Sequence, residues 1–296
     1  MISISHDLSN KIPKEHVTII RQVVQVADSE YSRLFIVGAQ ARDLILQHAY
    51  GLPIHRATND IDFGIVVENW VEFTKVREKL IASEKFKAHK IMKQRLVHES
   101  SLLIDLVPFG DLEDPIGQIA WPPDFSIVMS TIGFREAYDN SIVVRIAEDL
   151  TVKVASLAGL ALLKIVAWDD RRFERDAQDL GLIMRRYMDA GNADRVYTEV
   201  GDCIDLLNDQ FDYDKVSARI LGRDLSVLLT DASRPILDRA LLREVRKGGA
   251  EDLAIAMIRN NANYHGDYDV ALEMLAELSV GVSERTASNS LRLRDG

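Results

Sequence analysis

Apolar and polar positions in the first part of the chain follow a helical period, then a strand period, then a helical period again. Residues 13–31 repeat apolar side chains at helical spacing and predict an amphipathic helix. The apolar run 34–37 predicts a short buried strand that Gly38 closes, and residues 39–49 predict a second helix. The first unit is therefore predicted as strand, glycine corner and helix.

Apolar residues at 61, 63, 65 and 67 alternate with Asp60, Asp62 and Gly64 and predict a strand with the two aspartates on one face. A helix is expected over 70–82, followed by a hairpin-like region in which residues 102–107 form the clearest strand. Glycine and proline recur between Asp111 and Asp124, which predicts an irregular insertion. Short strands are expected to follow at residues 126–130 and 142–146. This alternation predicts an α/β or α+β domain with a mixed sheet flanked by helices.

The pattern changes from Ser156 onward, where long amphipathic stretches contain almost no proline apart from Pro235. The second half is therefore predicted to be all-helical. We expect two domains, an α/β domain over residues 1–154 and a helical domain over 155–296 that closes the cleft of the first.

Composition narrows the class of protein. The 296 residues are 47% hydrophobic and carry a formal net charge of −10. This negative charge argues against a protein that binds nucleic acid with its whole surface. Cys203 is the one cysteine, so neither an internal disulfide framework nor a cysteine-based zinc site is expected. The start of the chain does not resemble a signal peptide, and the longest apolar stretch, 154–163, is too short for a membrane span. These features predict a cytoplasmic protein without a membrane partner.

Two aspartates on one strand face are a common pattern and also a platform for Mg²⁺, which prefers hard oxygen ligands. Asp60 and Asp62 form such a pair, and Asp105 lies in the middle of an apolar strand, where an uncompensated charge is costly. Asp105 could complete a site for two metal ions. The alternative is a structural salt bridge with Arg42 or Arg95.

Gly38 stands where a strand enters a helix, and free backbone N–H groups at such a point attract phosphate. An ordinary tight turn explains the glycine equally well.

Lys164 lies on a strongly apolar helix and requires an anionic partner, either a nucleotide phosphate or Asp176. Arg172 with Asp176, and Arg175 with Asp179, have the i,i+4 spacing of solvated helix pairs.

These residues together resemble the polymerase-β-like nucleotidyltransferases, which have an apolar strand, a glycine pair, an Asp-x-Asp strand and a third carboxylate. The corresponding residues are Val37-Gly38-Ala39, Asp60-Ile61-Asp62 and Asp105. Residues 38–46 are also similar to the opening of tRNA nucleotidyltransferases, and residues 56–62 are similar to the AbiEii-type toxins.

The later sequence favours the AbiEii group, whose signature it resembles in Lys164, Arg171, Arg175-Asp176 and Asp179-Leu180. The resemblance covers about residues 34–182, and the helical remainder resembles no family. Ala39 departs from the pattern because it replaces the second glycine or serine of the usual pair, which removes a possible hydroxyl contact to phosphate.

The resemblance implies a metal-dependent transfer of a nucleoside monophosphate from an NTP. Asp60, Asp62 and Asp105 would hold two Mg²⁺ ions, with Mn²⁺ as a substitute, and Asp105 would help to deprotonate the attacking hydroxyl. The catalytic set would be these aspartates and Lys164. Nucleotide binding would involve Gly38, Ala39, Arg42, Lys164, Asp176 and Asp179.

A toxin of this kind implies an acceptor such as a tRNA end or a protein hydroxyl, and a separate antitoxin as partner. Two alternatives stay open from the sequence. One is a transferase that modifies a small molecule of the antibiotic type, for which an acid-walled cleft would fit better than a basic one. The other is a regulatory module that binds nucleotide without turnover.

Overall fold

A computed structural model describes residues 3–54, 58–199, 212–245, 252–259 and 268–292, with the side chains of 285–292 excepted. The chain divides into two compact units, Met1–Ser156 and Leu157–Gly296. The first contains all the strands of the described part, and the second contains only helices. The predicted fold class, a mixed sheet with helices followed by a helical region, is confirmed.

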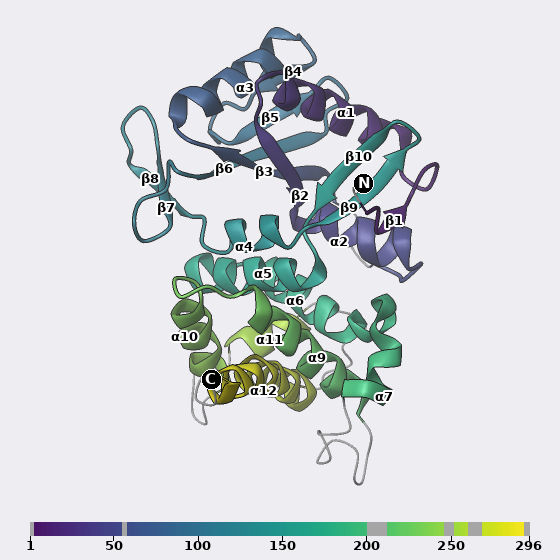
Figure 1. Cartoon of the computed structure of the whole chain (residues 1–296). Helices are drawn as coiled ribbons and strands as arrows, with labels where there is room; N and C mark the ends of the chain where they lie inside the picture. The colour runs from purple at the N-terminus through teal and green to yellow at the C-terminus, as the bar shows by residue number, and fades with distance from the viewer. Residues whose placement is uncertain (1–2, 55–57, 200–211, 246–251, 260–267, 293–296) are drawn as a thin grey trace. The chain divides into compact units, whose positions relative to one another are not determined.

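The first unit is built on an eight-stranded mixed sheet in the order β1-β9-β10-β2-β3-β6-β5-β4 (Figure 1). The central strand β3 pairs antiparallel with β2 and parallel with β6. A separate two-stranded hairpin is formed by β7 and β8. The strands are β1 (His6–Asp7), β2 (Arg33–Val37), β3 (Asp60–Val67), β4 (Phe86–Ala88), β5 (Arg95–His98), β6 (Leu103–Gly110), β7 (Gln118–Trp121), β8 (Ile127–Ser130), β9 (Ile142–Ala147) and β10 (Leu150–Val154).

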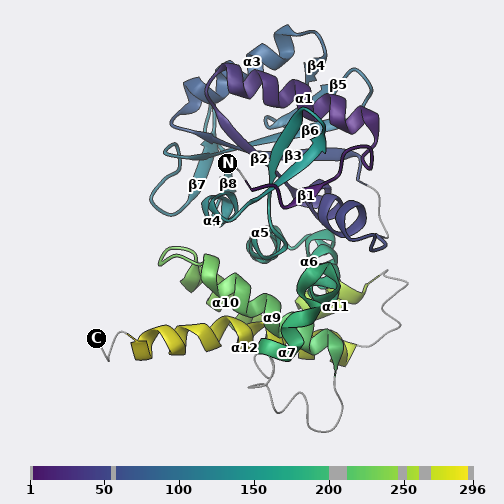
Figure 2. The ribbon, with the colours of Figure 1, turned by 45° about the vertical axis from the view of Figure 1, so that its right-hand side comes forward.

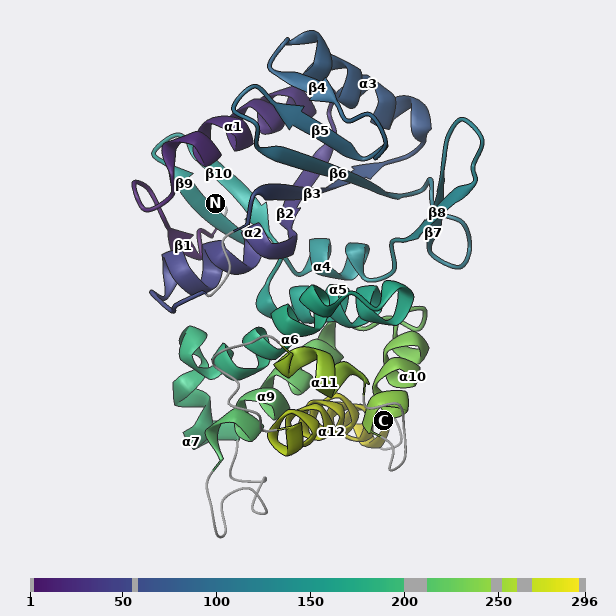
Figure 3. The same cartoon turned by 180° about the vertical axis from the view of Figure 1, so that it is seen from behind.

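The two faces of the sheet are covered differently. Helices α1 (Lys14–Ser29) and α3 (Trp70–Ala82) lie together across one face, as the view from behind in Figure 3 also shows. On the other face, Phe134 and Tyr138 of α4 (Phe134–Asp139) pack edge-on against Phe35 of β2. Phe35 stands opposite Gly64, so the alternation of β3 places Asp60 and Asp62 on the same face as this aromatic cluster.

The strand β3 shows why its sequence alternates. Ile61, Phe63 and Ile65 are fully buried, whereas Asp60 and Asp62 on the other face are partly exposed. The apolar set anchors the strand in the core, because burying each such side chain contributes about 1.5 to 3 kcal/mol. The carboxylates are thereby held on a fixed backbone at an accessible end of the sheet.

The predicted elements of the first unit are confirmed with three differences. The helix predicted over 39–49 is α-helical only in α2 (Gly38–Asp43) and continues as the π-helix η1 (Leu44–Ala49). The insertion predicted to be irregular contains β7. The hairpin-like region expected after residue 82 contains β4 and β5. The short strands β1 and β10 were not predicted, because each depends on a neighbouring strand more than on its own sequence pattern.

The second unit is helical throughout its described part, as predicted (Figure 2). Helices α9 (Tyr213–Leu228) and α12 (Tyr268–Arg292) approach closely, and a Cβ on Gly222 would lie 2.2 Å from the carbonyl oxygen of Leu278. Glycine is therefore required for these two helices to approach so closely. The helices are α5 (Leu157–Arg171), α6 (Glu174–Arg186), η2 (Met188–Asn192), η3 (Ala193–Arg195), α7 (Val196–Glu199), α9 (Tyr213–Leu228), α10 (Arg234–Val245), α11 (Asp252–Ile258) and α12 (Tyr268–Arg292).

Candidate active site

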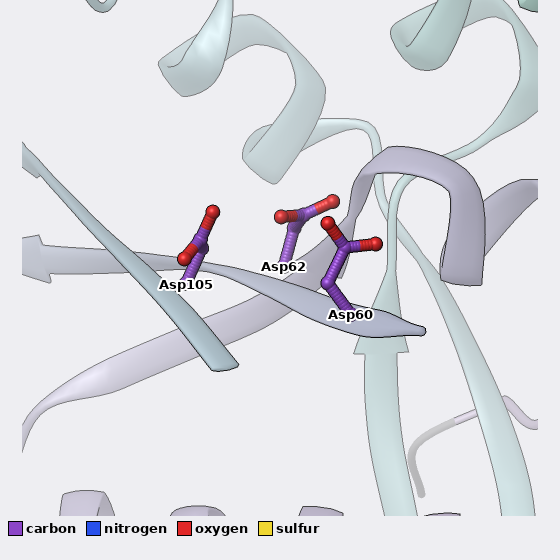
Figure 4. A group of neighbouring side chains, drawn as sticks. All are labelled: Asp60, Asp62 and Asp105. Atoms are coloured by element: carbon purple, nitrogen blue, oxygen red, sulfur yellow. The ribbon is translucent and has the colours of Figure 1, made fainter. Parts of the chain in front are cut away.

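Three aspartates from two adjacent strands converge at one end of the sheet. The parallel register sets Asp62 of β3 directly beside Asp105 of β6, and Asp60 lies two residues earlier on the same face of β3. One carboxylate oxygen from each residue lies within 4.8 Å of the others. Figure 4 shows the three side chains rising from their strands toward the same side. The structure therefore brings together the three carboxylates that the sequence singled out.

The chemistry of this group fits a divalent cation. Asp105 is only 8% exposed, and Asp60 and Asp62 are partly exposed, so three like charges are held together without full hydration. Such an arrangement is costly unless cations compensate it. Carboxylate oxygens are the hard ligands that Mg²⁺ binds through one or two residues plus substrate phosphates. Within the described residues, this is the one group of three acidic or histidine side chains close enough to share an ion.

Arg95 supplies a cation from within the chain. Its Nε and Nη2 donate hydrogen bonds of 2.7 and 2.6 Å to the two carboxylate oxygens of Asp105, and Nη2 lies 3.6 Å from Oδ2 of Asp60. The hydrogen bond from Arg95 to Asp105 raises the pKa of the guanidinium, burial lowers it, and the charges of the aspartates raise it further. Of the two arginines considered as structural partners for Asp105, the structure therefore selects Arg95.

A second contact orients Asp60. The hydroxyl of Thr58 donates a 2.5 Å hydrogen bond to Oδ1 of Asp60. Sequence reasoning overlooked Thr58, although a hydroxyl two residues before a strand aspartate is the local signal for such a contact. Thr58 fixes one oxygen of Asp60 and leaves the other facing Arg95.

Gly38 touches the carboxylate group directly. Its φ of +66° lies in the left-handed region, and a Cβ at this position would lie 1.9 Å from Oδ2 of Asp62. Both the backbone conformation and the close approach therefore require glycine. Gly38 begins α2, and the residue before it, Val37, provides no side-chain cap for the first N–H groups of the helix. Helix α2 thus begins next to the carboxylate of Asp62, with its first N–H groups not capped by a side chain.

The remaining two candidates on α2 are buried. Ala39 is 8% exposed and Arg42 is 3% exposed. Arg42 donates from Nε to Oδ1 of the neighbouring Asp43 at 2.8 Å, so its guanidinium is engaged with a carboxylate on its own helix. A role of Arg42 in nucleotide binding stays a prediction.

The second unit holds the other group of predicted residues, joined by ion pairs between α5 and α6. Nζ of Lys164 lies 2.9 Å from Oδ1 of Asp176 and 2.7 Å from Oδ2 of Asp179. Nε of Arg171 donates to the second oxygen of Asp176 at 2.8 Å. Burial lowers the pKa of Lys164, but the charges of Asp179 and Asp176 and their hydrogen bonds outweigh burial and raise it above its ordinary value. The ammonium of Lys164 is therefore firmly protonated.

The alternative interpretation of these charges as i,i+4 helix pairs is wrong for Arg172. Helix α5 ends at Arg171, and Arg172 takes a φ of +55° between α5 and α6. Its guanidinium then reaches Oε1 of the buried Glu244, at 2.7 Å from Nη1. Arg175 places its guanidinium over the ring of Phe173. Asp176 is held instead by Lys164 and Arg171.

The sequence profile of one protein family matches the chain from residue 44 to residue 263, and its description reads "Nucleotidyl transferase AbiEii toxin, Type IV TA system". The chain belongs to the AbiEii nucleotidyl transferase toxin family. The chain is accordingly a nucleotidyltransferase. The match contains the three aspartates of the first unit and Lys164, Asp176 and Asp179, whereas Gly38, Ala39 and Arg42 precede it.

The extent of this AbiEii match corrects one expectation. The sequence resembled the family only over about residues 34–182, and no family was assigned to the helical remainder, but the family match continues to residue 263. The helical unit is thus largely part of the family sequence. Amphipathic helices share a general pattern of apolar spacing, which explains why their sequence alone suggested no family.

Several solved structures are similar to this AbiEii chain at low sequence identity. The antibiotic-resistance factor ANT(2'')-Ia is 12% identical over 66% of this chain and 97% of its own, with a TM-score of 0.39. JHP933 from Helicobacter pylori is 13% identical over 95% of this chain and 97% of its own, with a TM-score of 0.38. The CCA-adding enzyme of Thermotoga maritima, in a complex with tRNA, is 12% identical over 97% and 84%, with a TM-score of 0.27. No curated protein sequence matches the chain significantly.

One further finding concerns membranes. In the part of the chain that the structure describes, no helix combines the length and the apolar character that crossing a bilayer requires.

Proposed function

We propose that this AbiEii-family chain transfers a nucleoside monophosphate from an NTP to an acceptor hydroxyl in a reaction that depends on divalent metal ions, and that it acts as the toxin of a toxin-antitoxin pair. The convergence of Asp60, Asp62 and Asp105 carries the proposal. Three carboxylates held this close, with one side open, suit metal-bound triphosphate better than they suit a folded core.

In this proposal, Asp60 and Asp62 would hold two Mg²⁺ ions, or Mn²⁺ in their place, and Asp105 would hold one of them. Ions bound there would supply charge stabilisation to the triphosphate. The acceptor oxygen forms a bond to the α-phosphorus, the bond from that phosphorus to the bridging oxygen breaks, and pyrophosphate leaves. Asp105 assists removal of the hydroxyl proton. Arg95 holds both oxygens of Asp105 and must share or release them for this role.

The triphosphate is proposed to lie along the N-terminal end of α2, where the backbone N–H groups of Gly38 and Ala39 can donate to it. Arg42 is proposed to support nucleotide binding from the same helix. Lys164 is proposed to supply positive charge to the transferred phosphate or to pyrophosphate, while Asp176 and Asp179 hold its ammonium in position. Each of these roles is separable by substitution.

The acceptor is proposed to be an RNA end, such as that of tRNA, or a protein hydroxyl. The description of the AbiEii family as a toxin of a toxin-antitoxin system supports a cellular target and a neutralising antitoxin. A macromolecular acceptor suits a toxin, because the modification of one hydroxyl can inactivate the whole acceptor molecule.

The test is transfer of label from each α-labelled NTP in the presence of Mg²⁺, with total tRNA, the protein itself and an aminoglycoside as parallel acceptors. Pyrophosphate release is measured in the same reactions. We expect label on a macromolecular acceptor and its loss in Asp60→Ala and in Asp62→Ala. The loss should be at least about 10³-fold, because several kcal/mol of transition-state stabilisation depend on the metal ions.

Asp28→Ala is the matched control, since Asp28 is an exposed aspartate on α1. Full transfer activity in Asp60→Ala or in Asp62→Ala would contradict the proposed mechanism. Tight nucleotide binding with no transfer to any acceptor would favour the regulatory module instead.

A further inference from the structure

A strongly basic segment connects the end of α3 to the strand that carries Arg95. Residues 85–95 contain Lys85, Lys87, Lys90, Lys93 and Arg95 and no acidic residue. The whole chain, in contrast, has 46 acidic against 36 basic residues. We call these eleven residues the basic hairpin; they comprise β4, the following loop and the first residue of β5.

The basic hairpin ends at the aspartate group. Arg95 pairs in register with Asp105, and the backbone N–H of Leu106 donates to the carbonyl oxygen of Gln94 at 2.9 Å. Lys90 is five residues before Arg95, so even a fully extended chain separates their Cα atoms by at most about 18 Å. An acceptor end that reaches Asp105 therefore has its next phosphates within range of the loop.

The lysines of the loop project into solvent. Lys87, Lys90 and Lys93 are exposed, and Ile91 between them is 80% exposed, so no other described segment covers the loop. Lys85 is paired with Glu99 at 2.8 Å, and Lys93 contributes to the electrostatic environment of Asp124. Among the described residues, no carboxylate lies within 4.0 Å of the ammonium of Lys87 or Lys90. These two lysines are thus available to an external anion.

Local positive charge matters more in an acidic protein than in a basic one. A net charge of −10 repels a polyanion from most of the surface, so productive encounters require a basic entry region. A cationic small molecule would be repelled by this hairpin, and an acceptor protein does not in general carry closely spaced negative charges. A nucleic acid strand carries one phosphate per nucleotide, which matches successive lysines.

We propose that the basic hairpin is the entry surface for an RNA acceptor, with Lys87 and Lys90 contacting phosphates next to the acceptor end. This inference rests on the proposed function and specifies RNA among its acceptors. Contacts to phosphates position the strand and carry little sequence preference, so the hairpin delivers the terminal hydroxyl toward Asp105 without selecting bases.

The test compares two double variants of the full chain that have the same net charge. One is Lys87→Glu/Lys90→Glu. The control is Arg33→Glu/Lys75→Glu, which changes two exposed residues; Arg33 is at the end of β2 that lies away from Asp62. Binding of total tRNA is measured over a range of salt concentrations, and transfer of label to tRNA is measured over a range of tRNA concentrations. Thermal melting verifies that both variants are folded, and Lys87→Gln/Lys90→Gln repeats the test without charge reversal.

We expect Lys87→Glu/Lys90→Glu to weaken tRNA binding by on the order of tenfold or more and to reduce the salt slope by about 1 to 2. The KM for tRNA should rise while kcat changes little. The control should stay within about twofold of the wild type, because the same charge is changed away from the entry surface.

Equal behaviour of the two double variants would overturn the inference and leave the proposed function intact if the wild type still labels tRNA. Wild-type protein that binds no tRNA, or that labels only protein, would also overturn the inference. Failure of the proposed function is recognised separately, by a wild type that transfers label to no acceptor.

Discussion

The two units each contain a cluster of aspartates, and the clusters differ in what lies between the carboxylates. In the first unit, oxygens of Asp60, Asp62 and Asp105 lie within 4.8 Å of one another. In the second unit, the ammonium of Lys164 lies between Asp176 and Asp179, at 2.9 and 2.7 Å. The first cluster is partly exposed, whereas the aspartate side chains of the second are 1% and 4% exposed.

The first arrangement suits binding of a cation from outside the protein, whereas the second links two helices of the protein to each other. A buried lysine between two carboxylates compensates them internally and fastens α5 to α6. In the first unit Arg95 lies at the edge of the cluster, and we propose that divalent cations from solution compensate the remaining charge of the converging carboxylates. The sequence presents both as aspartates close to basic residues, so only their arrangement in space distinguishes them.

Removing the internal cation of the second cluster should have the largest effect on stability. We expect Lys164→Met to destabilise the helical unit by about 3 to 5 kcal/mol, because two buried carboxylates lose a partner. The melting temperature should fall by on the order of 10 °C, as calorimetry can measure. Lys164→Arg, which keeps the charge, is the control and should lose less.

A double variant sharpens the same comparison. Lys164→Met/Asp179→Asn removes one charge of each sign and should regain much of the stability. Transfer activity should nevertheless stay low, because asparagine restores the charge balance but does not replace the ammonium. Recovery of transfer together with stability would show that Lys164 only holds the two helices.

A smaller effect, on metal affinity, is expected from replacing Arg95, which lies at the edge of the first cluster. Arg95→Gln should strengthen binding of Mn²⁺ to the nucleotide-free protein by roughly tenfold, because a unit charge no longer competes for Asp105. Titration calorimetry measures the affinity, with Arg95→Lys as the control that retains the charge. Unchanged affinity in Arg95→Gln would mean that Arg95 and the metal ion do not compete.

The smallest expected effect is a dependence of the stability of the first unit on pH. Burial lowers the pKa of His16, His48 and His98, all in the first unit, below the ordinary value. At a pH between the pKa of the folded state and the pKa of the unfolded state, these histidines bind protons only in the unfolded chain. Their contribution to the free energy of unfolding is therefore complete above about pH 6.5 and is lost as pH falls.

Melting of the first unit should therefore occur at lower temperature at pH 5.5 than at pH 7.5. His98→Gln should reduce this difference, and an unchanged difference in that variant would exclude a contribution from His98. The one histidine of the second unit, His265, lies outside the described residues.

Local sequence pattern was sufficient for the parts of the site that depend on a single strand. The alternation of residues 60–67 placed Asp60 and Asp62 on one face, and an apolar run placed Asp105 inside a strand. That β3 and β6 are adjacent and in register is a non-local fact, which the pattern of neither strand determines. The same limit applies to the contact of Arg95 with Asp105, which depends on where two strands lie, whereas the contact of Thr58 with Asp60 is local and was overlooked.

The errors have physical causes of the same kind. Strand β7 lies in a segment rich in glycine and proline, and it is a strand because β8 pairs with it. Asp176 pairs with Arg171 and not with Arg172 at i,i+4, because α5 ends at Arg171, and helix ends are poorly determined by periodicity.

The register that sets Asp62 directly opposite Asp105 has a consequence for how this protein can be altered. Like charges across adjacent strands weaken a sheet, so Asp62 lowers the stability of the strand pair that carries it, whereas Arg95 compensates the charge of Asp105. A chain optimised for thermal stability alone would therefore replace Asp62. Screens that select only for folded, heat-resistant protein should tend to recover variants at this position that lack the proposed metal site.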